Sequence, residues 1–313
     1  MSKPSHTESG PPPLGRRYAV GGRQLSLHCA GSGGPTVVFL PGAGLIGLDF
    51  LNVYEAVARL TTSVIYDRAG TGWSDAIALP RTAADVAEEL RQLLAAADIP
   101  PPYILVGHSL GGAYARRFAQ LFPQDVAGLV LLDPAHEGYA SMPGQPLLTQ
   151  VWQTLKLVPA LLNLRKVYRP MYERMFAAWP DRLRQRLIDY HLGHWGKTLA
   201  ESRNLQGEVM AEIAGGDPMP DTPLILLTAM GIDPFQAVLL PTPYLRELNL
   251  RKLAFYTAFA TSLPHGENRA IEDAGHSTLH TDRPDAVVAA IRDVVEAARI
   301  SAAAGARDRC VAA

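Results

Sequence analysis

The fold of this chain is decided by the stretch Tyr103-Ile104-Leu105-Val106-Gly107-His108-Ser109-Leu110-Gly111. Its first four residues are apolar and predict a buried strand, and the residues after Gly111 predict a helix that continues to Phe122. A serine on a sharp turn between a strand and a helix adopts a strained backbone, so its neighbours must be small. Glycines at positions 107 and 111 meet that need. The stretch therefore predicts a nucleophile elbow that presents Ser109 at the end of a strand.

The helix beyond Ser109 directs its unpaired N–H groups toward the serine. Negative charge that develops on a substrate oxygen would be stabilised there. A chance G-x-S-x-G in a Gly-rich protein is the alternative explanation, because short patterns with free positions are common. The strand before the motif, the helix after it and Gly112 favour the elbow.

The composition predicts a large soluble protein. The chain has 313 residues, 48% of them hydrophobic, and a net charge of −1, so it can bury a sizeable core. Basic and acidic residues are interspersed, which indicates neither a nucleic-acid groove nor a basic membrane patch. No window is apolar enough to span a bilayer, and residues 1–15 lack the apolar core of a secretory signal. With Cys29 and Cys310 interpreted as free thiols, we expect a cytoplasmic protein.

Strand-like and helical segments alternate along the first 135 residues. The Gly-Gly pair at positions 21 and 22 predicts a tight hairpin between strands at 17–20 and 24–29. Further strands are expected at 36–40, 63–66, 103–106 and 127–132, and helices at 51–60, 82–97 and 112–122. Strands that alternate with crossover helices predict a parallel sheet covered on both faces.

The alternation stops between residues 136 and 222. This segment is too long for a loop, and it carries helical periodicity and the tryptophans Trp152, Trp179 and Trp195. We interpret it as an inserted helical cap. The alternation resumes with strands at 223–227 and 268–272 and helices at 244–262 and 284–299. The expected domains are a disordered tail (1–15), an α/β core (16–135 and 223–300), the cap (136–222) and a flexible tail (301–313).

Four local segments carry a resemblance to the α/β-hydrolase superfamily that extends from about residue 17 to residue 299. They are the elbow, Leu40-Pro41-Gly42-Ala43-Gly44, the Gly-rich loop at 66–75, and Asp273-Ala274-Gly275-His276 with Asp282-Arg283-Pro284. The resemblance implies the α/β-hydrolase fold, a mostly parallel eight-stranded sheet with an inserted helical cap. The cap position is similar to that of epoxide hydrolases, dehalogenases and esterases. Serine at the elbow favours the capped, esterase-like branch of serine hydrolases, because the first two use aspartate there.

A histidine is expected beside Ser109, because a serine is a weak nucleophile at neutral pH and needs a base. Of nine histidines, His276 is the best candidate, since it follows a predicted strand and the resemblance places the catalytic histidine there. His108 lies inside the elbow and is expected to point away from the pocket. His280 is expected either to line the pocket or to make a structural polar contact.

Two aspartates compete as the acid that orients the histidine. The order Ser, Asp, His along the chain permits Asp133, after the predicted sixth strand, and Asp233, after the penultimate strand. Both are followed by proline. We favour Asp233, because a carboxylate after that strand would lie nearest the loop that carries His276, and we keep Asp133 as the alternative.

The oxyanion hole is expected to consist of backbone N–H groups. Leu110 follows the nucleophile and supplies one donor, and the resemblance assigns the other to Ala43. The family's histidine in this loop is replaced by Pro41. The replacement removes a side chain that often braces the loop.

No metal or organic cofactor is expected. His191 and His194, with Asp189 and Glu201 nearby, form only a weak metal pattern on a helix. Neither a P-loop nor a dinucleotide-binding glycine pattern is present in the sequence.

The sequence predicts a cofactor-free serine hydrolase that cleaves a small apolar ester or lactone through an acyl-enzyme on Ser109. A peptidase, a C–C hydrolase and an acyltransferase are alternatives of the same fold. A ligand-binding or receptor protein that retains the fold without turnover is an alternative of another class. The physiological substrate and the oligomeric state are left open.

Overall fold

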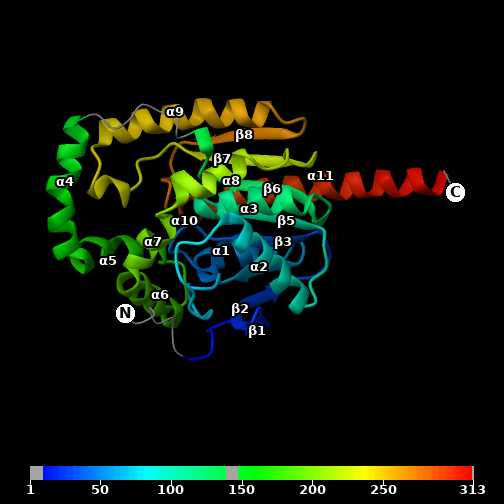
Figure 1. The fold of residues 1–313 in the computed structure, drawn as a ribbon, viewed down its shortest axis with the longest axis horizontal. Coiled ribbons are helices and arrows are strands. Elements are labelled where there is room, and N and C mark those ends of the chain that lie inside the picture. The colour runs from blue at the N-terminus through cyan, green and yellow to red at the C-terminus, as the bar shows by residue number, and fades with distance from the viewer. Residues whose placement is uncertain (1–9, 139–146, 312–313) are drawn as a thin grey trace.

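An eight-stranded sheet forms the centre of the protein in the computed structural model, which describes residues 10–138 and 147–311. The strand order is β1-β2-β4-β3-β5-β6-β7-β8 (Figure 1). The strands are β1 (Arg16–Val20), β2 (Arg23–Ala30), β3 (Thr36–Leu40), β4 (Ser63–Tyr66), β5 (Tyr103–His108), β6 (Val126–Leu132), β7 (Leu224–Ala229) and β8 (Gly266–Ile271). β2 pairs antiparallel with β1 and with β4, and all other pairs are parallel. The predicted mostly parallel eight-stranded sheet is therefore confirmed.

The hairpin between β1 and β2 turns at Gly21 and Gly22, whose φ angles are 53° and 79°. Glycine adopts such positive φ angles without strain, which is why this pair closes the turn.

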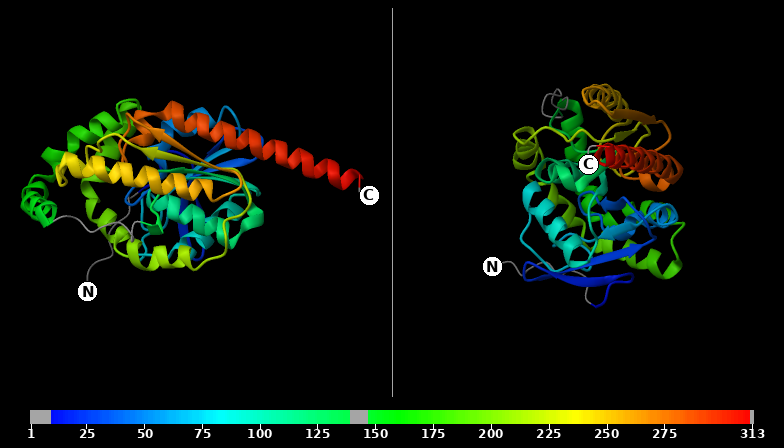
Figure 2. Two further views of the ribbon diagram at one scale, coloured as in Figure 1. Left: turned by 90° about the horizontal axis from the view of Figure 1, so that it is seen from above. Right: turned by 90° about the vertical axis from the view of Figure 1, so that its right-hand side faces the viewer.

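Helices cover both faces of the sheet (Figures 1 and 2). They are α1 (Leu51–Val57), α2 (Ala83–Ala96), α3 (Leu110–Leu121), α9 (Thr242–Thr261), α10 (Leu279–Asp282) and α11 (Pro284–Val311). Successive residues of a strand face opposite sides, so Val37 and Phe39 of β3 pack in one core with α1 and α11, while Val38 and Leu40 pack in another with α2 and α3. The central strands β3 to β7 are buried on both faces, as a parallel sheet covered by helices requires.

Between β6 and β7 the chain forms further helices, which we call the helical insertion (residues 147–214). They are α4 (Leu147–Leu162), α5 (Leu164–Met175), α6 (Asp181–Gly193), α7 (Trp195–Ser202), the one-turn η4 (Leu205–Val209) and α8 (Met210–Ala214). Trp179 is buried and its indole N–H donates to the Leu48 carbonyl at 2.9 Å, which ties the insertion to the loop after β3. The segment 139–146, within the predicted cap, lies outside the described residues.

The last helix is longer than the sequence predicts. α11 continues past Arg299 to Val311, so residues 301–311, expected to form a flexible tail, are helical. It extends away from the body of the protein (Figure 2). The run Ala302-Ala303-Ala304 is exposed, and alanine has the highest intrinsic helix propensity, so the helix continues where no apolar stripe predicts it. Of the predicted N-terminal tail, residues 1–9 lie outside the described residues.

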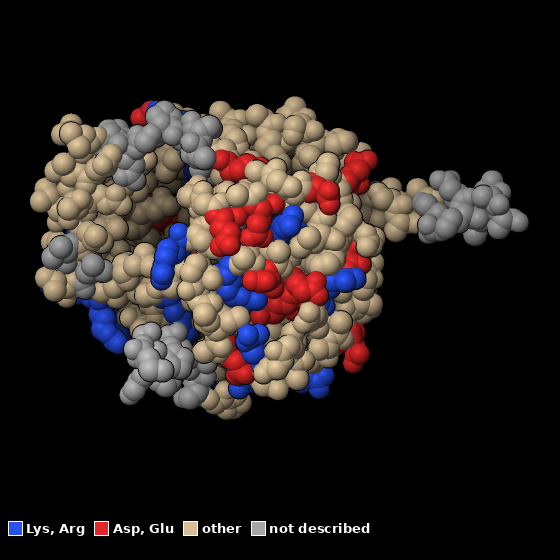
Figure 3. Space-filling view, in the orientation of Figure 1, with Lys and Arg blue, Asp and Glu red and all other residues tan. Residues whose placement is uncertain are grey.

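The described surface carries both signs of charge. Lys and Arg lie among Asp and Glu on the face in Figure 3, which is hollowed beside the helical insertion at its left. None of the described helices is both long enough and apolar enough to cross a membrane.

Candidate active site

Ser109 lies between β5 and α3 with φ 52° and ψ −119°. A non-glycine residue at positive φ is strained, and such strain accumulates at functional sites. The neighbouring glycines relieve crowding: a Cβ at Gly107 would lie 2.5 Å from the Gly111 carbonyl oxygen, and one at Gly111 would lie 2.0 Å from that of Leu40. The Ser109 N–H donates to the Leu132 carbonyl at 3.1 Å. The backbone therefore fixes the serine at the carboxyl edge of the sheet.

His276 lies on the loop after β8 and connects the serine to a carboxylate. Its Nε2 is 3.0 Å from the Ser109 Oγ, and its Nδ1 is 2.6 Å from the Asp133 Oδ2. A carboxylate only accepts hydrogen bonds, so Nδ1 carries the hydrogen and Nε2 is free to accept one from the serine hydroxyl. Serine, imidazole and carboxylate are therefore hydrogen-bonded in series, in the geometry of a nucleophile with its base.

Asp133 follows β6 directly and also has a positive φ, of 43°. It is fully buried, and its Oδ1 accepts the Ala229 N–H at 3.2 Å. Burial alone would raise the pKa of this carboxyl, but the Lys252 ammonium, 2.7 Å from Oδ2, and the His276 hydrogen bond hold that pKa well below its ordinary value. Asp133 therefore stays ionised at neutral pH.

The expectation that Asp233 contacts the His276 imidazole is wrong. Its carboxylate instead accepts the backbone N–H groups of Gln236, at 2.8 Å, and of Ser277. A Cβ at Gly275 would lie 2.8 Å from the Asp233 Cα, so the histidine loop does pass beside this aspartate. Asp233 therefore holds the backbone of the loop that carries His276. Asp133, at the end of the neighbouring strand β6, contacts the His276 imidazole.

Lys252 is a residue that the sequence reasoning missed. It lies on α9, is 5% exposed, and donates to the Asp133 Oδ2 and to the Ala229 carbonyl. Asn249, on the same helix face, donates to the Met230 carbonyl at 2.9 Å. Asn249, Lys252 and Tyr256 are three and four residues apart, so they form a polar stripe on one face of the helix. This spacing is the sequence pattern that could have indicated Lys252.

The loop after β3 carries Ala43, which lines a cavity beside Ser109. The Arg68 guanidinium is buried and donates to the carbonyls of Pro41 at 2.6 Å and Gly42 at 2.9 Å. In the described part of the chain, the Ala43 N–H has no acceptor. The two carbonyls that directly precede the Ala43 N–H are therefore held, and this N–H is left available.

The second brace of this loop comes from the helical insertion. Glu201, on α7, accepts the Gly44 N–H at 2.6 Å and pairs with the Arg68 guanidinium at 3.1 Å. Both side chains are at most 3% exposed. A Cβ at Gly44, whose φ is +72°, would meet the Thr198 Oγ1 at 1.9 Å, so α7 packs directly on the loop. Arg68 and Glu201 supply the support that Pro41 cannot, and no spacing pattern along the chain predicts that these two residues pair.

Two other histidines lie beneath His276. The His108 Nε2 is 2.8 Å from the His276 carbonyl oxygen, and His280 stacks on Phe50 with ring centroids 4.4 Å apart. Burial lowers the pKa of His108 well below its ordinary value and that of His280 to about 4. Both rings are therefore neutral at pH 7 and support the histidine loop. His108 borders the cavity, although it was expected to point away, and His280 is not among its lining residues.

A cavity of about 370 Å³ opens over Ser109 and His276. The helical insertion supplies much of its lining, including Tyr168, Tyr172, Met175, His191, Trp195 and Thr198. The segment 235–240 after β7 supplies a further wall. None of the described lining residues is Asp, Glu, Lys or Arg, so the cavity suits an uncharged molecule.

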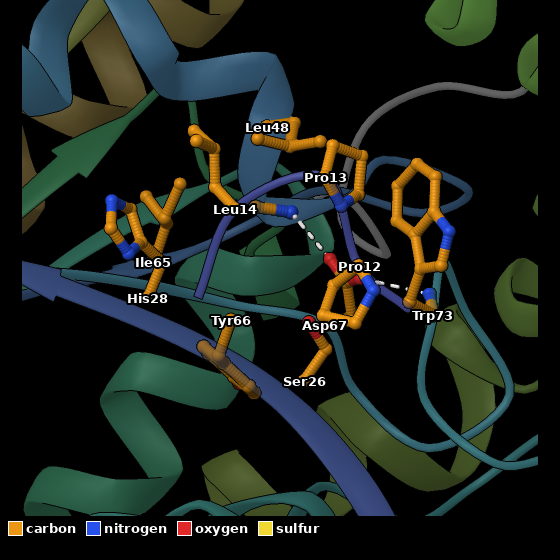
Figure 4. A pocket seen from close by; sticks show the side chains of 11 residues that line it. Pro12, Pro13, Leu14, Ser26, His28, Leu48, Ile65, Tyr66, Asp67 and Trp73 are labelled. Carbon is orange, nitrogen blue, oxygen red and sulfur yellow. Dashed lines mark hydrogen bonds between the residues drawn. The ribbon is translucent and has the colours of Figure 1, made fainter. Parts of the chain in front are cut away.

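A second, smaller cavity is lined by Asp67 and Trp73 of the loop after β4. Asp67 accepts the backbone N–H groups of Gly47 at 3.0 Å and Trp73 at 2.9 Å beside it (Figure 4). Burial raises the pKa of Asp67 to about 6. Neither Ser109 nor His276 borders this cavity. Because Asp67 fixes the backbone of the Gly-rich loop, we assign Asp67 a structural role.

The chain matches the family described as "Alpha/beta hydrolase family" over residues 37–290. It is 39% identical over 121 residues to the uncharacterized protein YqjL of Bacillus subtilis, covering 38% of this chain and 48% of that protein. The chain spans about half or less of the curated relatives it matches.

Two solved structures show the same fold at low sequence identity. The esterase of Thermogutta terrifontis has a TM-score of 0.61 at 18% identity, covering 90% of this chain and 98% of that one. The enol-lactonase of Burkholderia xenovorans LB400 has a TM-score of 0.62 at 17% identity, covering 90% and 99%.

Proposed function

Because this chain belongs to the alpha/beta hydrolase family, we propose that it is a serine hydrolase that cleaves an uncharged ester or lactone. The hydrogen-bonded series of Ser109, His276 and Asp133 carries the proposal. This arrangement activates a hydroxyl for attack on a carbonyl carbon. The esterase and lactonase among the structural neighbours agree with this reaction class.

In the proposed acylation, the Ser109 Oγ attacks the ester carbonyl while its proton passes to the His276 Nε2. Asp133 stabilises the imidazolium that forms. The N–H groups of Ala43 and Leu110 stabilise the negative carbonyl oxygen of the tetrahedral intermediate. The C–O bond then breaks, and His276 returns the proton to the departing alkoxide oxygen.

Deacylation repeats these steps with water. His276 takes a proton from the water as its oxygen attacks the acyl carbon, and the Ser109 Oγ leaves with that proton. The products are an acid and an alcohol, or a hydroxy acid when the substrate is a lactone. No residue outside this set is needed for proton transfer.

The proposal is tested by 4-nitrophenyl ester hydrolysis and by labelling with a fluorophosphonate. A hydrolase is expected to release nitrophenolate and to carry one covalent phosphonate on Ser109, located by peptide mass spectrometry. A peptidase, a C–C hydrolase or an acyltransferase would label but prefer other substrates. A binding protein that retains the fold would show neither turnover nor label, and that result would refute the proposal.

The cavity lining predicts a preference for neutral acyl groups. A 4-nitrophenyl ester of butyric acid is expected to exceed the succinic acid monoester in kcat/KM by on the order of a hundredfold, because an unpaired carboxylate would lose its hydration in the cavity. Steady-state kinetics on the two esters measures the ratio. Equal values would show that the acyl group stays outside the cavity.

Glu201 holds the loop at 41–44 that carries Ala43, which we call the oxyanion loop, and this contact predicts a positioning role for the helical insertion. Glu201→Gln is expected to lower kcat/KM about tenfold to a hundredfold, because a small displacement of an oxyanion donor is costly. Affinity for a trifluoromethyl ketone, which forms a tetrahedral adduct with the serine, is expected to fall in parallel.

The matched control is Glu137→Gln, which disrupts another pair with a buried arginine, Arg116, outside the cavity lining. Thermal stability is expected to fall in both variants, and ketone affinity only in Glu201→Gln. Equal loss of ketone affinity in both would reduce the role of Glu201 to general stability.

A further inference from the structure

A second histidine–carboxylate pair borders the catalytic cavity. The His191 Nε2, on α6, is 2.9 Å from the Asp49 Oδ1 in η1 (Gly47–Phe50). The other oxygen, Oδ2, accepts the Ile46 N–H at 2.8 Å, and Asp49 is fully buried. Both carboxylate oxygens are therefore occupied, so Asp49 holds one fixed orientation.

The His191 ring is also fixed by its aromatic neighbours. Tyr172 lies nearly parallel to it, with centroids 4.9 Å apart and planes at 11°, and Phe176 lies at 5.6 Å and 18°. Tyr190 meets it edge-on at 81°. Packed from these directions and hydrogen-bonded at Nε2, the imidazole cannot rotate without breaking the Asp49 contact.

The remaining ring nitrogen is the polar atom that His191 can offer to a ligand. The Asp49 carboxylate accepts the hydrogen of Nε2, so in the neutral ring Nδ1 is a hydrogen-bond acceptor. Nδ1 has no partner among the described residues, although His191 is only 5% exposed and lines the cavity that contains Ser109. Nδ1 is not among the fully buried side-chain atoms without a partner, so it is accessible at the cavity wall, where water or a ligand can satisfy it.

We propose that His191, oriented by Asp49, is a specificity subsite that accepts a hydrogen bond from a neutral donor of the substrate, a hydroxyl or an amide N–H. The inference rests on the proposed ester hydrolysis and names the substrate class more closely. The rings of Tyr172 and Phe235, 5.0 Å apart, provide an apolar wall beside this acceptor. The substrate is thus an uncharged ester with an apolar body and one hydrogen-bond donor away from the scissile bond.

The first test compares pairs of 4-nitrophenyl esters whose acyl chains carry a hydroxyl or a methoxy group, moved one carbon at a time. At the matching position, the hydroxyl ester is expected to exceed the methoxy ester in kcat/KM by on the order of tenfold. His191→Phe keeps an aromatic ring and is expected to bring the ratio to about one. His194→Phe is the control, because the His194 Nδ1 is hydrogen-bonded to the Tyr190 carbonyl and His194 does not line the cavity.

The second test exploits the tautomer. Asp49→Asn keeps the shape of the side chain, but its carbonyl oxygen is needed by the Ile46 N–H, so its NH₂ faces the imidazole. The His191 Nε2 must then accept, which moves the ring hydrogen to Nδ1. The hydroxyl preference is expected to vanish, since hydroxyl and methoxy oxygens both accept. Survival of the preference in a folded variant would contradict the proposed orientation.

A binding measurement separates this subsite from the proposed reaction. In Ser109→Ala protein, Trp195 lines the cavity and reports binding of methyl esters by fluorescence. The hydroxyl ester is expected to bind about tenfold more tightly than the methoxy ester, and equally after His191→Phe. The subsite would be overturned, even if hydrolysis is confirmed, if the hydroxyl and methoxy esters bound equally while His191 is present. Tighter binding of a carboxylate-bearing ester would also overturn it. The expected binding pattern without turnover in the wild type would support the subsite and refute the hydrolase.

Discussion

Ser109→Ala is expected to lower the hydrolysis of 4-nitrophenyl butyrate roughly 10⁴-fold to 10⁶-fold, because the covalent route disappears while the oxyanion donors remain. The fold is expected to persist, since the contacts that fix the elbow are backbone contacts. The residue's own N–H and carbonyl make the bonds to Leu132 and Ala135. Stopped assays with extended reaction times measure the residual rate, and circular dichroism checks the fold.

His276→Ala provides the matched test of cooperation. Its loss is expected to approach that of Ser109→Ala, and the double variant should be little worse than either, because groups that act as one unit are not additive. Retention of more than a few per cent of the wild-type rate by Ser109→Ala would remove the basis of the proposed mechanism. Additive losses in the double variant would show that the two residues act separately.

Asp133→Asn is expected to lower kcat by roughly 10³-fold to 10⁴-fold. The new side chain keeps a carbonyl oxygen for the Ala229 N–H, so its NH₂ faces His276. The imidazole Nδ1 must then accept, the ring hydrogen moves to Nε2, and the base can no longer take the serine proton. The variant also leaves Lys252 without its counter-charge, so a loss of stability on the order of a few kcal/mol is expected.

Asp233→Asn is the control for this prediction. It weakens a loop contact with the Ser277 N–H, so a loss of about tenfold is expected from a less ordered histidine loop. Kinetics at saturating substrate on both folded variants gives the ranking. If Asp233→Asn were the more damaging of the two, the acid would be at the end of β7.

The sheet and the elbow were predictable because both are local in the sequence. The strand at 103–108, the glycines around Ser109 and the helix after it form one continuous pattern, and their geometry requires small residues at fixed positions. His276 was identified because it follows the last predicted strand and because the resemblance to the α/β-hydrolase superfamily places the catalytic histidine there. These features are set by neighbours along the chain, which a sequence displays directly.

The wrong choice of acid has a physical origin. Asp133 and Asp233 both follow strands and precede proline, and the sequence does not show which carboxylate the backbone directs toward the ring. In the structure Asp133 has a positive φ, and its Oδ2 accepts a hydrogen bond from the buried Lys252, a contact between segments 119 residues apart. Arg68 and Glu201 are 133 residues apart in the chain, so their pairing could not be predicted from the sequence either.

The contact of Glu201 with the oxyanion loop bears on how substrate range can be re-engineered in this protein. Exchanging the insertion for one from a relative would leave the Arg68 guanidinium buried and without a counter-ion unless the graft carries an acid at the corresponding turn of its helix. A chimera without this side chain is therefore expected to lose at least the roughly tenfold to hundredfold in kcat/KM that we expect for Glu201→Gln. The residues that support the proposed active site therefore do not all lie in the α/β core, because Glu201 belongs to the helical insertion.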